Sequence, residues 1–145
     1  MPDTGSGEVK TRAFVITDYD AAVALWNRAD GIEIAEGDER EDVIFFLKQN
    51  RDLSRVAEDS GTVVGVALCG HDGRRGYIYH LAVEPSYQMK GIARRLVNEC
   101  LEGLRRCGLK RALILVADDN PAGQAFWQRA GWEDVPGAKV MGIDL

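Results

Sequence analysis

The clearest periodicity in the chain runs from residue 93 to residue 104. Apolar side chains recur there at the three- and four-residue spacing of one helix face. They are Ala93, Leu96, Val97, Cys100, Leu101 and Leu104. Gly108 follows this stripe, and glycine is the residue that most often closes a helix. The pattern predicts a long amphipathic helix that ends at Gly108.

Runs of branched and aromatic residues predict the strands. The expected strands are Arg12–Ile16, Arg55–Glu58, Thr62–Leu68, Tyr77–Val83, Arg111–Val116 and Lys139–Leu145. Ser60-Gly61 separates two of them as in a hairpin, so these two should be antiparallel neighbours. After Arg111 the run to residue 116 is apolar throughout, as in a strand that is covered on both faces.

Three further helices complete the pattern. Thr17 and Asp20 resemble a capping box, which opens a helix that stops at Gly31, with Ala22, Leu25, Trp26 and Ala29 on one face. A short helix marked by Val43, Phe46 and Leu47 ends near Asn50, and Asn120-Pro121 caps a helix that Gly131 ends. Trp26, Phe45 and Phe46 are expected in the core.

The element order β-α-α-β-β-β-α-β-α-β predicts an α/β fold of the α+β type. Its central sheet should be mixed, mostly antiparallel and flanked by about four helices. A length of 145 residues fits one domain, which we place at residues 11–145. Residues 1–10 are polar and rich in glycine, and they lack the apolar middle of a secretory signal, so we expect a flexible lead-in.

Composition excludes several classes of function. The net charge of −5 argues against a general nucleic-acid binder or a protein of anionic membrane surfaces. The longest apolar stretch, Ala112 to Ala117, is far shorter than the roughly 20 residues of a membrane span.

Cys100 and Cys107 would lie about 10 Å apart along one helix, too far for a disulfide. With only two histidines besides, no metal site is predicted, and reduced thiols indicate a cytoplasmic protein.

The segment with the clearest candidate for ligand binding is Gln88-Met89-Lys90-Gly91-Ile92-Ala93, which leads into the long helix. A helix N-terminus presents backbone N–H groups without intrahelical acceptors, together with a partial positive charge. Gly91 allows close approach of a ligand, and Lys90, Arg94 and Arg95 add positive charge. Residues 88–111 carry seven basic and two acidic side chains. The segment therefore predicts a phosphate site, although charge alone would also fit a solvated basic face.

This hexapeptide resembles the Gln/Arg-x-x-Gly-x-Gly/Ala pyrophosphate loop of the GNAT family, the N-acetyltransferases that depend on acetyl-coenzyme A (acetyl-CoA). The preceding His80-Leu81-Ala82-Val83-Glu84-Pro85 resembles the strand before that loop. Asp119-Asn120-Pro121-Ala122 and the segment from Ala125 to Trp132 resemble the family's Asn-capped helix, which ends in a Gly-aromatic pair. The three motifs occur in the family's order, and the resemblance covers roughly residues 14–145.

The resemblance implies the residues of the acetyl-CoA site. Backbone amides of residues 89–94 would hold the pyrophosphate, and the backbone of Leu81 and Val83 would pair with the pantetheine arm. The full implied set is Leu81, Val83, Gln88, Met89, Lys90, Gly91, Ile92, Ala93, Arg94, Asn120 and Trp127. It also implies that the strands holding Leu81 and Leu115 separate to leave a slot for the thioester.

In this family the acceptor amine attacks the thioester directly, and a backbone amide near Leu81 would polarise the carbonyl. Trp127 stands where relatives often carry a tyrosine acid, and its indole N–H cannot deliver a proton at neutral pH. Tyr77 and Tyr79 occupy positions where relatives often carry the base, and by pleat alternation they share a face with Leu81 and Val83. Tyrosine is a poor base, so we expect these two to shape the acceptor pocket or order a water.

By the same alternation the side chain of His80 points to the opposite face of the strand from Tyr77 and Tyr79. We therefore expect a packed or hydrogen-bonded histidine behind the sheet in preference to a catalytic one. Residues 31–42 contain six acids and one base, Arg40, and the resemblance places this connection beside the acceptor cleft. A cationic acceptor would be drawn to it, although a merely solubilising loop would have the same composition.

The sequence therefore predicts an acetyl-CoA dependent N-acetyltransferase that acts on an amine of a small molecule or peptide. The alternative is a non-catalytic acyl-CoA binding or sensing module, and a purely structural protein would have no affinity for CoA. The terminal strand at residues 139–145 could pair with a second copy, which would make a homodimer.

Overall fold

A computed structural model of the chain describes residues 8–145. The chain divides after Leu115 into two compact units. The first unit contains the strands β1 (Val9–Ala13), β2 (Arg55–Asp59), β3 (Thr62–His71), β4 (Gly76–Val83) and β5 (Ala112–Leu113). Its helices are η1 (Ile16–Asp18), α2 (Tyr19–Arg28), α3 (Arg40–Gln49), η2 (Pro85–Tyr87) and α4 (Ile92–Arg106). The second unit contains α5 (Pro121–Arg129).

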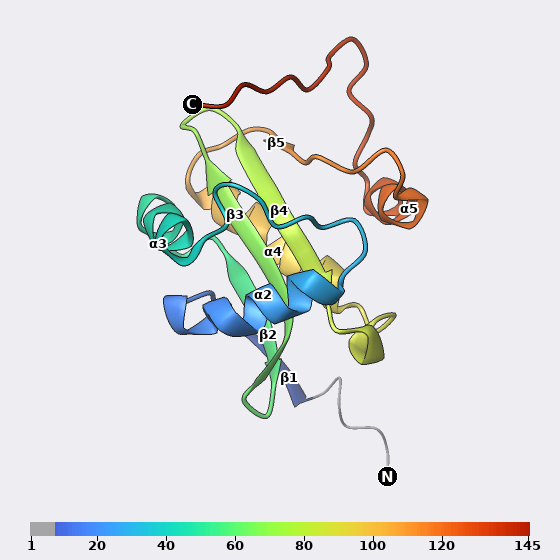
Figure 1. The fold of residues 1–145 in the computed structure, drawn as a ribbon. Coiled ribbons are helices and arrows are strands. Elements are labelled where there is room, and N and C mark those ends of the chain that lie inside the picture. The colour runs from blue at the N-terminus through green and yellow to red at the C-terminus, as the bar shows by residue number, and fades with distance from the viewer. Residues whose placement is uncertain (1–7) are drawn as a thin grey trace. The chain divides into compact units, whose positions relative to one another are not determined.

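The five strands form one sheet in the order β1-β2-β3-β4-β5 (Figure 1). Neighbouring strands from β1 to β4 are antiparallel, and β5 alone runs parallel to its neighbour β4. The mixed, mostly antiparallel sheet predicted from the sequence is confirmed.

Helices cover both faces of this sheet. On one face α2 and α3 enclose the main apolar cluster, which consists of Phe14, Ala22, Leu25, Trp26, Val43, Val56, Val66, Leu68 and Ala82. On the other face α4 packs against β3 and β4 and buries four of the six residues of the predicted stripe, which are Leu96, Val97, Cys100 and Leu104. A Cβ atom added to Gly65 of β3 would lie 3.1 Å from Leu96 Cδ1, so the missing side chain lets α4 approach the sheet closely.

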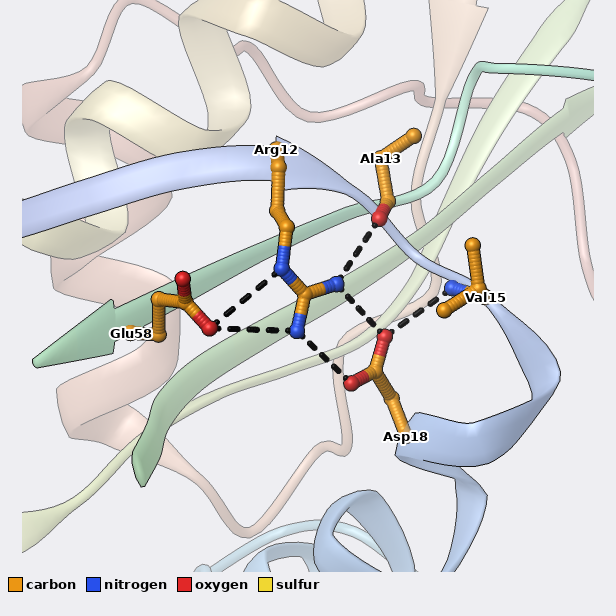
Figure 2. Close-up of polar contacts among 5 residues, drawn as sticks. All are labelled: Arg12, Ala13, Val15, Asp18 and Glu58. Carbon is orange, nitrogen blue, oxygen red and sulfur yellow. Dashed lines mark hydrogen bonds and ion pairs between the residues drawn. The ribbon is translucent and has the colours of Figure 1, made fainter. Parts of the chain in front are cut away.

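Arg12 joins β1 to two other elements (Figure 2). Its guanidinium donates to both carboxylate oxygens of Asp18, at 2.8 and 2.9 Å, and Nη2 also donates to Glu58 at 3.2 Å. Asp18 also accepts the backbone N–H of Val15 at 2.9 Å. Burial raises the pKa of Asp18, but the hydrogen bonds from Arg12 and Val15 outweigh it and the pKa falls below its usual range. β1, η1 and β2 are fixed to one another by this network.

The ends of several elements differ from the prediction. β1 begins three residues early, so Val9 and Lys10 pair with β2 instead of belonging to a lead-in, while residues 1–7 lie outside the described residues. The predicted capping box of Thr17 and Asp20 is wrong, because Asp18 accepts the Val15 N–H two residues earlier. Phe45 is 64% exposed on α3, so its placement in the core was wrong, whereas Trp26 is fully buried.

Two predicted strands are shortened or missing. β5 covers two of the six residues predicted, since only Ala112 and Leu113 have a partner strand. Residues 139–145 form no strand, because the described part of their own unit offers one helix and no strand for backbone pairing. No helix within residues 8–145 has the length and apolar character needed to cross a membrane.

Candidate functional site

A β-bulge interrupts β4 at the residues before the predicted phosphate loop. Val66 of β3 pairs with Ala82 and Leu68 pairs with Tyr79, so two residues of β4, His80 and Leu81, lie opposite one residue of β3. His80 adopts a left-handed backbone conformation with a φ of 52°. The extra residue reverses the alternation of side chains along the rest of β4.

The reversal overturns two predictions about side-chain faces. Tyr79 packs against the apolar cluster on the α2 side, whereas Val83 pairs with Gly65, whose Cβ position faces α4. The tyrosines therefore do not share a face with Val83. His80 lies on the α2 side, with its ring centroid 5.0 Å from that of Trp26, and not behind the sheet.

Three contacts hold His80 in place. The indole Nε1 of Trp26 donates to the backbone carbonyl of His80 at 2.8 Å, which satisfies a group that the bulge removes from the strand ladder. The imidazole Nε2 lies 3.0 Å from Oδ2 of Asp38 in the connection between α2 and α3. The exposed fractions of the two side chains are 20% for His80 and 15% for Asp38. The result is a histidine–carboxylate pair whose histidine lies on β4, directly before Leu81.

The acidic connection is held through the same aspartate. Asp38 exchanges hydrogen bonds with Ala35, whose N–H donates to Oδ2 at 3.1 Å and whose carbonyl accepts the Asp38 N–H at 3.1 Å. The Tyr19 hydroxyl donates to the Asp38 carbonyl at 2.6 Å. α2 ends at Arg28 and α3 begins at Arg40, so the connection begins two residues earlier and ends three residues earlier than the predicted segment 31–42.

Tyr77 and Tyr79 are stacked at a centroid distance of 5.8 Å, with 13° between their ring planes. Phe46 of α3 meets Tyr79 edge-on at 6.3 Å. Burial, followed by the neighbouring Tyr77, raises the pKa of Tyr79, which makes its phenolate still less available as a base. The two tyrosines form a packed aromatic wall on the same face as His80.

β4 has a partner strand on its β5 side only at its start. Pairing with β5 covers Gly76 and Tyr77, and within residues 8–145 no strand pairs with that edge from Ile78 to Val83. Leu115 lies outside β5 and is 66% exposed. Within residues 8–145 the backbone edge that includes Leu81 therefore has no partner strand on this side, and the resemblance implies that the pantetheine arm would pair with it.

The loop from Gln88 to Gly91 is shaped by two left-handed residues. Met89 has a φ of 65° and is fully exposed, and Gly91 has a φ of 82° and caps α4. Gln88 closes the loop against β4 through a hydrogen bond of 3.2 Å from Nε2 to the Val83 carbonyl. The first backbone hydrogen bond of α4 runs from Arg95 to the Gly91 carbonyl at 3.0 Å.

That bond leaves the N–H groups of Ile92 and Ala93 ahead of the intrahelical ladder, in the arrangement that favours an anion. A Cβ atom added to Gly91 would have no heavy atom within 4 Å, so the space beside the loop backbone is open. The residues present therefore fit a phosphate group.

The basic side chains near the loop have different environments. The Lys90 ammonium lies 5.4 Å from the centre of the Tyr87 ring. Arg95 turns toward β1, where it donates to the Val9 carbonyl at 3.2 Å and to Thr11 at 3.3 Å. The prediction that Arg95 adds charge at the loop is therefore wrong, because β1 and Glu99 of its own helix engage its guanidinium.

Two of the predicted cofactor residues lie in the second unit. Asn120 caps α5 as predicted, since its Oδ1 accepts the Gly123 N–H at 3.1 Å. Trp127 of α5 packs edge-on against Phe126 and Trp132, at centroid distances of 5.2 and 5.0 Å. Both residues have structural roles within their unit.

Comparison with known proteins identifies the family. Residues 15–132 match the acetyltransferase (GNAT) family model. An acetyltransferase of Pectobacterium atrosepticum is 32% identical over 127 residues, covering 88% of this chain and 89% of that protein. An acetyltransferase of Sodalis glossinidius is 31% identical over 137 residues, covering 94% of this chain and 96% of that protein.

The fold is also that of solved acetyltransferases. The PaiA N-acetyltransferase of Thermoplasma acidophilum, solved in complex with coenzyme A, superposes with a TM-score of 0.76 at 18% identity, covering 89% of this chain and 93% of that one. The chain belongs to the GNAT acetyltransferase family. It is an acyltransferase, and its cosubstrate is acetyl-CoA.

Sequence reasoning missed the position of His80. A strand was assumed to alternate strictly, and one extra residue reverses that alternation. A usable signal was the residue type itself, since histidine, like asparagine and aspartate, enters the left-handed region more readily than most residues.

Proposed function

We propose that this chain transfers the acetyl group of acetyl-CoA directly to an amine of a small molecule or peptide. The observation that carries the proposal is the loop from Gln88 to Gly91, whose two left-handed residues lead into α4, where the N–H groups of Ile92 and Ala93 precede the intrahelical ladder. In this proposal the amides of residues 89–94 bind the pyrophosphate. Gln88 holds the loop to β4 through its bond to the Val83 carbonyl.

The backbone of β4 would position the thioester. The open edge from Ile78 to Val83 offers extended backbone for pairing with the pantetheine arm, and the bulge redirects the N–H of Leu81. In this proposal the Leu81 amide donates to the thioester carbonyl as negative charge develops on its oxygen. Tyr77 and Tyr79 shape the acceptor pocket beside it.

The acceptor is proposed to be a cationic amine, such as a polyamine, a basic peptide N-terminus or an aminoglycoside-like amine. Supporting this, the connection before α3 carries Glu33, Glu36, Asp38 and Glu39, and Glu41 and Asp42 follow in the first turn of α3. Acidic side chains gathered at the mouth of a site raise the local concentration of cations.

We further propose that residues 11–145 form one acetyltransferase domain located in the cytoplasm. The family match from residue 15 to residue 132 spans both compact units, which supports a single domain. The proposed homodimer would no longer pair preformed terminal strands, since residues 139–145 form none. A non-catalytic acyl-CoA sensor is the competing function.

Turnover distinguishes the enzyme from the sensor. The purified protein is incubated with acetyl-CoA and a panel of amines, and acetylated product is measured by mass spectrometry. We expect product with at least one cationic amine, and we expect Lys90→Glu to reduce it by placing negative charge beside the loop. Tight acetyl-CoA binding without product across the panel would favour the sensor.

A further inference from the structure

The β-bulge and the acidic connection together build a histidine–carboxylate pair that the proposed transfer reaction does not yet use. His80 and Asp38 come from segments 42 residues apart in sequence, and their side chains meet at 3.0 Å. The bulge is required for this contact, because strict alternation would place the His80 side chain on the α4 face. Trp26 fixes the bulge through its hydrogen bond to the His80 carbonyl.

The contact with Asp38 sets which ring nitrogen carries the proton. An ionised carboxylate can only accept hydrogen bonds, so Nε2 of His80 is the donor and Nδ1 keeps its lone pair. Within residues 8–145 no side-chain nitrogen or oxygen is buried without a partner, and the only bonded ring nitrogen of His80 is Nε2. Nδ1 therefore reaches solvent.

The placement of that lone pair has a consequence for the reaction. His80 directly precedes Leu81, so the two Cα atoms are separated by one peptide unit, about 3.8 Å. If the Leu81 amide donates to the thioester carbonyl, the imidazole belongs to the residue directly before the one that holds the carbon under attack. Neither Trp26 nor Asp38 supplies the base, because Trp26 cannot accept a proton and Asp38 is engaged by Nε2.

We propose that His80 is the general base of this acetyltransferase, with Asp38 as the positioning residue that holds its tautomer; this inference rests on the proposed function. The acceptor arrives as an ammonium ion, and Nδ1 of His80 takes one proton from it. The free amine forms the N–C bond to the thioester carbon, and the C–S bond breaks with its electron pair passing to sulfur. The second amine proton leaves with the CoA thiol, and His80 returns its proton to water.

The carboxylate that faces the ring comes from the connection before α3, and Tyr19 of α2 holds the Asp38 carbonyl.

His80→Asn is the sharpest variant, because asparagine tolerates the left-handed backbone that the bulge requires. His71→Asn is the matched control: it replaces the chain's other histidine, whose Nδ1 accepts the Gly73 N–H in the β3–β4 turn. We expect His80→Asn to lower kcat/KM by roughly 100-fold or more, as for loss of a general base, and to leave the Kd for acetyl-CoA unchanged. The control should keep the native value.

A second measurement does not depend on an acceptor. Long-range ¹H–¹⁵N NMR spectra of the full chain should show His80 protonated at Nε2 and not at Nδ1, with this preference reduced in Asp38→Asn.

The role of His80 and the proposed acetyltransferase function are contradicted by different results. Acetyl-CoA binding and turnover that persist within twofold in His80→Asn would overturn the inference and leave the proposed function standing. An Nδ1-protonated His80 would overturn it as well. A native protein that neither binds acetyl-CoA nor acetylates any amine would overturn the proposed function, and the inference with it.

Discussion

Replacing Gly91 with alanine tests whether the backbone of the loop before α4 holds the cofactor. Gly91 has a φ of 82°, a region that costs an L-residue about 1–2 kcal/mol. Alanine also reduces the entropy of the unfolded chain, which offsets about 0.4–1 kcal/mol. The net loss in free energy of unfolding should therefore be about 1 kcal/mol, with no steric term, because nothing lies within 4 Å of the added methyl group.

Gly73→Ala is the matched control for this change. Gly73 has a φ of 91°, also lacks neighbours within 4 Å of an added Cβ, and lies in the β3–β4 turn. Both variants should lose similar stability in urea denaturation. Only Gly91→Ala should weaken acetyl-CoA binding, because a loop that relaxes away from the strained conformation must regain it on binding.

The expected magnitude follows from the same strain. If the loop of the variant must return to the left-handed conformation at a cost of about 1–2 kcal/mol on binding, the Kd for acetyl-CoA rises by roughly 5- to 30-fold. Calorimetric titration of both variants with acetyl-CoA measures it. Equal affinities in Gly91→Ala and Gly73→Ala would refute the reasoning that the loop backbone forms the pyrophosphate site.

Three further predictions concern the framework around the site. Trp26→Phe should lower the free energy of unfolding by about 1–3 kcal/mol, because it leaves the His80 carbonyl without a donor, and chemical denaturation measures this. Asp18→Asn should destabilise the protein at neutral pH, and its difference from the native protein should shrink as pH falls below about 4; an unchanged difference at pH 3 would contradict the lowered pKa. A thiol reagent should titrate one cysteine, Cys107, in the native protein and all three after unfolding, whereas rapid reaction of the two buried thiols would contradict their placement.

The sequence predicted the parts of the fold that follow from side-chain periodicity. The stripe of α4 was identified correctly, since six apolar positions at helical spacing have few alternative explanations. The Asn120 cap was also predicted correctly, because its hydrogen bond joins residues only three apart. Such local features depend little on the rest of the chain.

The features that failed depend on a partner distant in sequence. The position of His80 depends on how β3 and β4 are aligned, and its role depends on Asp38, which no spacing rule connects to it. Residues 139–145 alternate well enough for a strand, but a strand exists only where another backbone pairs with it. The acidic character of the connection was visible in the sequence, whereas its attachment to His80 was not.

Binding of acetyl-CoA to the native protein tests the central claim most directly. Purified protein is titrated calorimetrically with acetyl-CoA, and CoA, ATP and NAD serve as comparison ligands. The account predicts saturable micromolar binding of acetyl-CoA, shared by CoA and not matched by ATP or NAD. Absence of acetyl-CoA binding would contradict the proposed cofactor site. Equal binding of all four ligands would show that the loop before α4 is a general phosphate site.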